Sequence, residues 1–389
     1  MRRAARWPSR DIDLPHFIRR GRTALQLVCV IPALACGTEA QPQLGDAATP
    51  AHDAASAIRA RYAGALSSTD TSPARLVADA PTGAVRIADD GRGQRIPNEM
   101  GRIPILQYHL IGDRDGRWER GAEQFRRDLQ LLYERGYRPV SVSDLVDRRL
   151  ELPRGLSPVV FTFDDASPSQ FRYVERDGQL EIDPTSAVGI WLDFNRRHAD
   201  WENKAVFCML SGAEAGRSFF GNKNIEGQKT EWRFPKVRFL AARGFELCNH
   251  TLWHANLGKY DDAFVQEQIA RGGLAIDSVI PGYRVRTFAL PLGVWPKNVE
   301  LARRGSWRDP VTARTIAYDF SAVLLVSGQP VPSPHDPAFD PFRLERVQVF
   351  ASELEKMLDR LDRSGARYVS DGDPLTIARP TTVAARLLP

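Results

Sequence analysis

Strand-like and helix-like segments alternate along most of this chain, and this alternation most constrains its fold. Short apolar runs rich in β-branched and aromatic residues predict strands, and the longer amphipathic stretches between them predict helices. The expected strands are 103–108, 137–142, 158–163, 205–210, 245–249, 286–290 and 322–327. The expected helices are 123–135, 186–198, 234–243, 261–280 and 352–364. Such alternation favours a parallel α/β architecture, and the number of strands suits a barrel.

Two pairs of chemically active side chains fall at the ends of expected strands. Asp164 and Asp165 follow the strand 158–163, and His250 and His254 begin directly after the strand 245–249. Adjacent carboxylates are costly to bury unless a cation or hydrogen bonds compensate them. One carboxylate and two imidazoles can bind an ion and leave room for water, as catalytic zinc sites do. The other carboxylate is then available as a base, which predicts metal-assisted hydrolysis.

Each pair taken alone has a simpler explanation. Two aspartates after a strand often begin a loop or cap a helix. Two histidines four residues apart are also weak evidence, and Thr251 stands where zinc proteases of the His-Glu-x-x-His type carry their glutamate. The carboxyl ends of parallel strands meet at one face of a barrel, however. We therefore expect both pairs to lie together there.

The motifs, in this order, resemble the polysaccharide deacetylases with a NodB-homology domain. The resemblance extends from about Ile103 to Ala378 and includes a Thr-Phe-Asp-Asp strand end, a His-Thr-x-x-His turn and the segment Pro291-Leu292-Gly293. It implies a distorted (β/α) barrel of the NodB type and hydrolysis of N-acetyl groups on a polysaccharide, with release of acetate. It also implies Zn²⁺ or another divalent metal. The implied roles are Asp164 as general base, Asp165, His250 and His254 as metal ligands, and the backbone N–H of Leu292 as oxyanion donor.

The chain departs from the family pattern at the partner of the base. Ala289 stands where many members carry an arginine that orients the base, and Arg284 or Arg286 is the expected substitute. The pair Arg343 and Arg346 is predicted to be structural, with contact to substrate as the alternative.

The general acid is a second departure. The late Leu-x-x-His motif that supplies it in the family is missing, and the segment 341–347 stands in the corresponding region. His109 and His335 are the nearest candidates. Two other functions therefore stay open: a glycan-binding lipoprotein that kept the barrel but lost catalysis, and an O-acetyl esterase.

Charge and hydropathy at the start of the chain predict export. Residues 1–35 hold seven of the 53 basic residues and two of the 48 acidic ones, so the rest of the chain carries 46 of each. That balance gives no electrostatic reason to expect nucleic acid as a partner. The arginines precede an apolar stretch, 24–35, which is too short to span a bilayer but suits a signal peptide. We expect a periplasmic, extracellular or membrane-anchored protein.

These features divide the chain into three parts. Residues 1–36 form a signal peptide or a lipoprotein signal, in which Cys36 is a possible site for a lipid anchor. Residues 37–100 are poor in large apolar side chains and are expected to be a flexible linker. Residues 101–380 form the catalytic domain.

Two smaller features of the catalytic domain carry predictions. Cys208 and Cys248 lie on expected strands; we interpret them as two buried free thiols, with a disulfide as the alternative. Residues 172–183, centred on Asp177-Gly178, predict a hairpin inserted in a loop.

Overall fold

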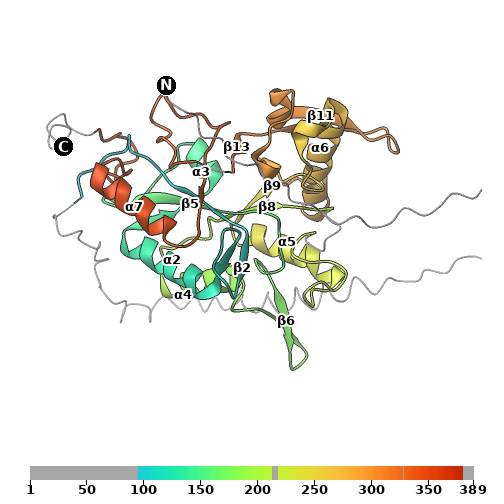
Figure 1. Cartoon of the computed structure of the whole chain (residues 1–389), viewed down its shortest axis with the longest axis horizontal. Helices are drawn as coiled ribbons and strands as arrows, with labels where there is room; N and C mark the ends of the chain where they lie inside the picture. The colour runs from blue at the N-terminus through green and yellow to red at the C-terminus, as the bar shows by residue number, and fades with distance from the viewer. Residues whose placement is uncertain (1–94, 213–217, 327, 380–389) are drawn as a thin grey trace, which may run out of the picture. The chain divides into compact units, whose positions relative to one another are not determined.

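The computed structural model describes residues 95–212, 218–326 and 328–379 (Figure 1). The predicted signal, Cys36 and nearly all of the predicted linker lie outside the described residues. None of the described helices is both long and apolar enough to cross a membrane.

The strands of the central sheet are parallel. β1 pairs with β5 and with β14, β5 with β8, β8 with β9, β9 with β10, and β10 with β13. The order across the sheet is therefore β13 (Ala322–Leu324), β10 (Thr287–Ala289), β9 (Glu246–Asn249), β8 (Val206–Met209), β5 (Ser157–Phe163), β1 (Ile105–Tyr108) and β14 (Val347–Gln348). β4 (Tyr137–Pro139) extends the sheet beside the start of β5.

A further bridge closes this sheet into a ring. Leu344, three residues before β14, forms a parallel bridge with Leu324 at the end of β13. The same segment therefore contacts the last strand through Leu344 and the first strand through β14. The predicted distorted (β/α) barrel is confirmed.

Alternation along each strand separates two hydrophobic layers. Ile105, Val160, Val206, Cys208 and Cys248 pack together inside the ring. The intervening positions, such as Phe161 and Phe207, pack in a second cluster with the apolar faces of the helices. Both faces of the sheet are thus covered, which is why β5 reads as one continuous apolar run, as buried parallel strands do. Val160, Thr162 and Asp164 are two residues apart, so all three side chains point into the ring.

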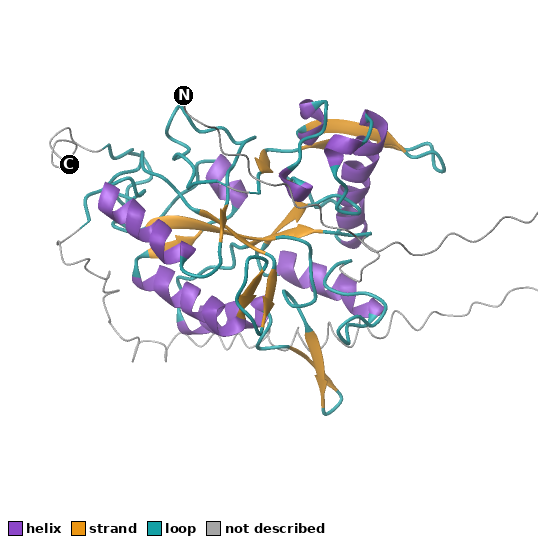
Figure 2. Cartoon of the chain, viewed as in Figure 1, coloured by secondary structure: helices purple, strands orange, loops and turns teal. Residues whose placement is uncertain are grey.

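Most helices pack on the outer side of the strands (Figure 2), whereas α3 (Val142–Val146) packs Val142 and Leu145 against the cluster inside the ring. The others are α2 (Ala122–Glu134), α4 (Ala187–Arg197), α5 (Arg233–Ala242), α6 (Asp262–Val279) and α7 (Glu353–Ser364), with short 3-10 turns at Thr230–Trp232, Leu257–Lys259, Pro291–Gly293 and Val299–Ala302. α2 buries Phe125, Leu129 and Leu132, the spacing of one helical face. Ser186 and Asp261 cap α4 and α6 through their side chains.

Three hairpins or short ribbons accompany the barrel. The predicted hairpin is present as β6 (Tyr173–Arg176) and β7 (Gln179–Ile182), and Asp177 and Gly178 take the positive φ angles that its tight turn needs. The sequence did not predict β2 (Leu110–Gly112) paired with β3 (Glu119–Gly121), or β11 (Arg304–Arg308) paired with β12 (Thr315–Asp319). The second of these packs against α6 (Figure 1).

Most of the expected strands are shorter in the structure, and two of them end well before their predicted ends. The strand expected over 137–142 ends at Pro139, because Ser141 and Asp144 form a reciprocal capping box that starts α3. The strand expected over 322–327 ends at Leu324.

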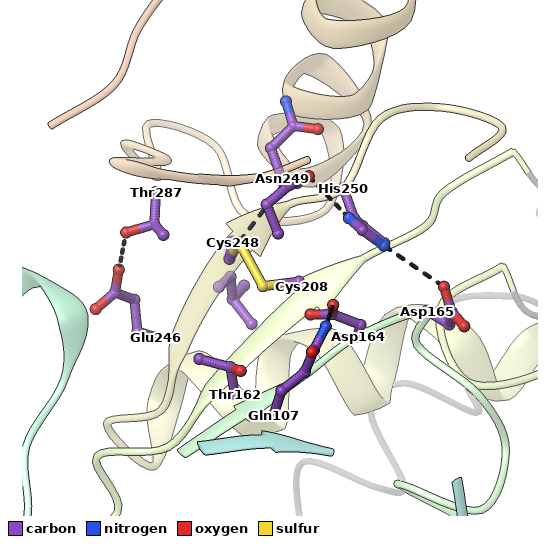
Figure 3. The surroundings of a disulfide bond; sticks show 12 residues. Gln107, Thr162, Asp164, Asp165, Cys208, Glu246, Cys248, Asn249, His250 and Thr287 are labelled. Atoms are coloured by element: carbon purple, nitrogen blue, oxygen red, sulfur yellow. Dashed lines mark hydrogen bonds and ion pairs between the residues drawn. A yellow bond between two sulfur atoms is a disulfide. The ribbon is translucent and has the colours of Figure 1, made fainter. Parts of the chain in front are cut away.

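Cys208 and Cys248 form a disulfide inside the ring (Figure 3). They lie directly opposite each other in the register of β8 and β9, with both side chains facing inward. The interpretation as two free thiols is therefore wrong in this structure. It failed because sequence alone does not give the register that makes the two residues neighbours.

Candidate active site

Asp164 lies at the inward-facing end of β5, and its carboxylate is fully enclosed. Its side chain is 1% exposed. Oδ1 accepts a hydrogen bond from Arg346 at 2.7 Å, and Oδ2 accepts one from Arg346 at 2.7 Å and one from Gln107 at 2.9 Å (Figure 3 shows Gln107). Burial alone would raise the pKa of Asp164, but the charges of Arg346 and His250 outweigh burial and hold this pKa well below its usual range. Asp164 is thus an ionised, oriented acceptor.

Arg346 is the partner that orients this carboxylate, and the sequence did not identify it. Its side chain is 0% exposed and also donates to Thr162 Oγ1 at 3.1 Å and to the carbonyl of Leu325 at 2.5 Å. The threonine of the Thr-Phe-Asp-Asp motif therefore helps to hold the arginine. Because Arg346 is fully buried, it makes no direct contact with a ligand at the surface.

The two arginines predicted for this role lie elsewhere. Arg286 makes a bidentate ion pair with Asp147, at 2.7 and 2.6 Å, and Arg284 is exposed. That prediction is wrong, because both residues precede β10, at the opposite end of the strand from the site. Arg343 is exposed as well, 3.9 Å from Asp340.

Asp165, His250 and His254 converge as the sequence predicted. Their ligand atoms all lie within 4.8 Å of one another. Asp165 Oδ1 is 3.5 Å from His250 Nε2 and 3.6 Å from His254 Nε2. Ligands about 2.0–2.1 Å from a tetrahedral zinc ion lie about 3.3–3.4 Å apart. Two nitrogen donors and one oxygen donor at these separations fit such an ion, and this set leaves a fourth position for water.

Hydrogen bonds fix His250 in the orientation that a ligand needs. Its Nδ1 donates to the carbonyl of Ala289 at 2.8 Å, so Nε2 is the nitrogen that faces Asp165. Burial lowers the pKa of His250, but the nearby carboxylates of Asp164 and Asp165 outweigh it and raise this pKa above its usual value. Burial and then the charge of His250 lower the pKa of His254 to about 4.

The turn that carries the two histidines is held by Asn249 and Thr251. Asn249 Oδ1 accepts from the backbone N–H of Thr251 at 2.8 Å, and its amide donates to the carbonyl of Ile269 on α6 at 2.8 Å. The hydroxyl of Thr251 accepts from the backbone N–H of His254 at 3.0 Å. The threonine of the His-Thr-x-x-His motif thus shapes the turn.

Several residues at the site have a strained backbone. Non-glycine residues with positive φ include Asp165 (78°), Ala166 (47°), Thr251 (70°), His254 (59°) and Leu292 (58°). Each such residue costs about 1–3 kcal/mol, and such residues are common at functional sites. The requirement for positive φ at Ala166 gives a physical reason why the family usually carries glycine there.

Leu292 lies on the 3-10 turn Pro291–Gly293, directly after β10, and its side chain is 56% exposed. It follows Ala289, the residue that accepts from His250, by three positions. Its role as an oxyanion donor stays a prediction.

Of the two candidates for the general acid, the structure brings only His109 to the site. His109 Nε2 is 4.0 Å from Asp164 Oδ2. Burial lowers the pKa of His109, although Asp164 and Asp165 act in the opposite direction. His335 lines a separate hollow with Arg148 and Tyr368.

Gln170 connects the two strand ends that carry His109 and Asp164, and it was also missed. Its amide donates to the carbonyl of His109 at 2.6 Å and to that of Asp164 at 2.5 Å. Alternation along β1 could have indicated that Gln107, two residues after the inward-facing Ile105, also points into the ring toward the site. No comparable signal marks Gln170, which lies in a loop.

Part of the chain is similar to known polysaccharide deacetylases. Residues 200–305 match the family model described as polysaccharide deacetylase. A chitooligosaccharide deacetylase of Sinorhizobium fredii is 26% identical over 115 residues, which cover 30% of this chain and 52% of the relative. One from a Bradyrhizobium species is 32% identical over 63 residues, which cover 16% of this chain and 29% of the relative. The chain thus spans about half the length, or less, of these curated relatives.

Similar solved structures include a Streptococcus pyogenes deacetylase, PplD, in complex with acetate. It is 16% identical with a TM-score of 0.47, over 66% of this chain and 97% of that one. IcaB from Ammonifex degensii is 18% identical with a TM-score of 0.45, over 67% and 97% of the two chains. The match over residues 200–305 includes His250, His254 and the segment Pro291–Gly293, but not the pair Asp164 and Asp165. This part of the chain is similar to the polysaccharide deacetylase family.

Proposed function

We propose that this protein removes N-acetyl groups from a polysaccharide by metal-dependent hydrolysis and releases acetate. One observation carries the proposal. A buried, ionised carboxylate, Asp164, lies directly beside the converging set of Asp165, His250 and His254 at the carboxyl ends of the barrel strands. A base next to a three-ligand site with room for water is the arrangement that hydrolysis of an amide requires.

A divalent ion held by Asp165, His250 and His254 would make a water acidic enough to attack at neutral pH and would polarise the acetyl carbonyl. Asp164 removes the proton of the attacking water. Its low pKa keeps it ionised, and its bonds to Arg346 and Gln107 hold both oxygens in one orientation. The backbone N–H of Leu292 is assigned to the developing oxyanion.

His109 is assigned to the proton that the leaving amine needs. Since burial lowers its pKa, the imidazole is neutral before the reaction and can pass on a proton only after receiving one. Asp164 Oδ2, 4.0 Å from Nε2, is the nearest group that gains a proton in the reaction. The proton taken from water therefore moves from Asp164 through His109 to nitrogen, which leaves as the free amine.

The same site suits an O-acetyl ester, because attack on the carbonyl is identical and the leaving alcohol needs less help from an acid. A protein that only binds glycans is the less favoured alternative. It would have no need for the buried Asp164–Arg346 pair, whose two charges are costly to remove from water.

Export is part of the proposal. Support comes from the arginine-rich start of the chain and from the Cys208–Cys248 disulfide, since disulfides persist in oxidising compartments. Cell fractionation of the source organism, with mass determination of the mature N-terminus, tests this and shows whether Cys36 carries lipid. A cytosolic protein with an intact N-terminus would contradict export.

Acetate release by the full chain from matched N-acetylated and O-acetylated oligosaccharides tests the reaction. With zinc we expect release from the N-acetylated series, and with chelator we expect none. Release from the O-acetylated series alone would replace the proposal by an esterase. Zinc binding and glycan binding without any release would reject catalysis.

A further inference from the structure

Exposed aromatic rings lie beside the candidate site on two sides. Trp118 is 46% exposed and Trp253 is 49% exposed. Trp118 precedes β3, and Trp253 lies between the two histidines of the metal set. Large rings left open to water mark binding surfaces when they adjoin a functional site.

Trp118 is connected to the site through His109. The two rings meet edge to face with centroids 4.8 Å apart, and His109 in turn lies 4.0 Å from Asp164. The carbonyl of Trp118 accepts from the backbone N–H of Leu110 at 3.0 Å. Close by in the chain, the side chain of Arg120 bonds both oxygens of Asp115, at 2.9 and 3.0 Å. The indole is therefore held before any ligand arrives.

Arg120 also ties this loop to the rest of the domain. It donates to Asp128 on α2 at 2.6 and 2.9 Å, and Asp128 accepts in addition from Tyr108 of β1 at 3.1 Å. Through Asp128 and Tyr108, Arg120 thus connects the loop that holds Trp118 to β1, the strand that His109 follows.

Trp253 is held on the other side of the site. Its backbone N–H donates to Gln268 of α6 at 3.1 Å. A Cβ at Gly212 would lie 3.0 Å from Trp253 Nε1, so the indole rests against backbone that has no side chain. Phe264 lies 6.3 Å from the Trp253 ring, and Tyr260, which is 43% exposed, stacks on Phe264 at 4.1 Å. Three rings therefore extend from the metal set.

The order of strands places these two groups on opposite sides of the carboxylates. Trp118 belongs to the segment after β1, and Trp253 belongs to the segment after β9. β5, which carries Asp164, lies between β1 and β9 in the sheet. On the shorter way round the ring from β1 to β9, a ligand in contact with both indoles passes the strand end that Asp164 follows.

We propose that Trp118 and Trp253 are two sugar-stacking platforms, which bind glycan residues on either side of the sugar that loses its acetyl group. Phe264 and Tyr260 continue the Trp253 platform. The flat C–H face of a pyranose is apolar and covers an aromatic ring, while its hydroxyl groups stay in water. The substrate is thus a glycan chain of at least three sugars, attacked internally. This inference rests on the proposed function.

Acetate release from β-1,4- and β-1,6-linked N-acetylglucosamine oligomers, from one to six units long, tests the platforms. For the better series we expect kcat/KM to rise at least about tenfold between the monomer and the trimer. Trp118→Ala and Trp253→Ala should each raise KM for the hexamer about tenfold, as expected for the loss of one ring contact. In both variants KM for the hexamer should rise by a larger factor than KM for the monomer. Trp253→Phe should keep most of the affinity, because it keeps a ring.

Trp307→Ala is the matched control. Trp307 is a partly buried indole on β11 that lies beside Arg271 of α6, and its loss should leave KM unchanged. Turnover of monomer and hexamer with equal kcat/KM, or unchanged KM in both tryptophan variants, would overturn the platforms and leave the proposed reaction standing.

Binding of the same oligomers to the protein in chelator separates the two proposals. Binding that increases with length and is lost in Trp118→Ala and Trp253→Ala, without acetate release when zinc is restored, supports the platforms and rejects the reaction. If neither series binds or reacts, both proposals are wrong.

Discussion

Replacing Arg346 by methionine tests the central pair of the site most directly. The change removes two hydrogen bonds of 2.7 Å and leaves the carboxylate of Asp164 buried at 1% exposure beside an apolar side chain. Removing one partner of a buried ion pair costs about 3–5 kcal/mol. Gln107 still donates to Oδ2, so we expect a loss near the lower limit, about 3 kcal/mol at pH 7, measured by urea denaturation in chelator.

The loss should depend on pH with a defined sign. In the native protein the pKa of Asp164 is lowered, so its contribution to stability is present above the unfolded pKa and disappears as pH falls through the folded pKa. Without Arg346, burial becomes the dominant influence and raises the pKa of Asp164 above its unfolded value. The variant then gains a proton on folding in acid, and its deficit should shrink between pH 7 and pH 4.

Two companions make the test specific. Arg286→Met removes an equally bidentate but part-exposed pair with Asp147, and it should cost less than about 1 kcal/mol. Asp164→Asn added to Arg346→Met removes the buried charge, so the double variant should recover much of the loss. A deficit of under about 1 kcal/mol at pH 7, or one that does not change with pH, would refute this account of the pair.

Three further predictions concern the elements around the pair. Gly272→Ala should weaken zinc binding, measured by calorimetry, about tenfold, because its Cβ would lie 2.6 Å from Asn249 Oδ1 and disturb the histidine turn. Gly273→Ala is the control, since its Cβ would meet only Asn249 Nδ2 at 3.6 Å. Equal zinc affinities of the two variants would contradict this role of Gly272. Cys208→Ser with Cys248→Ser should lower the free energy of unfolding by about 4 kcal/mol, since the bridge spans 40 residues; an unchanged urea midpoint relative to the oxidised protein would argue against it. His109→Asn should lower kcat about a hundredfold or more with zinc content unchanged, if His109 transfers the proton; kcat close to that of the native enzyme would remove it from the reaction.

The sequence predicted the parts of this fold that have local patterns. β5 could be predicted because its buried positions appear in the sequence as a run of β-branched and aromatic residues. α2 could be predicted because its apolar residues share one helical face. Asp165, His250 and His254 could be grouped because parallel strands place their carboxyl ends at one face. The β11–β12 hairpin was missed because its exposed positions alternate with half-buried ones and give only a weak apolar signal.

The partner of the base could not be predicted from the same information. Arg346 and Asp164 are 182 residues apart, and nothing in the local pattern near residue 346 indicates that its side chain enters the ring. The arginines weighed instead were close to β10 in sequence but at its other end in space. The disulfide likewise depended on register, which the separate patterns of β8 and β9 do not fix.

Closure of the ring by the segment around Leu344 has a consequence for biogenesis. During synthesis β5, β8, β9 and β10 leave the ribosome long before the segment around Leu344. Asp164 therefore cannot pair with Arg346 until almost the whole domain has been made. Contacts of such long range form late and slow folding. A nascent or C-terminally clipped chain therefore has its histidines and aspartates but no stable place for the base, and we expect full activity to appear only in chains that extend past Arg346.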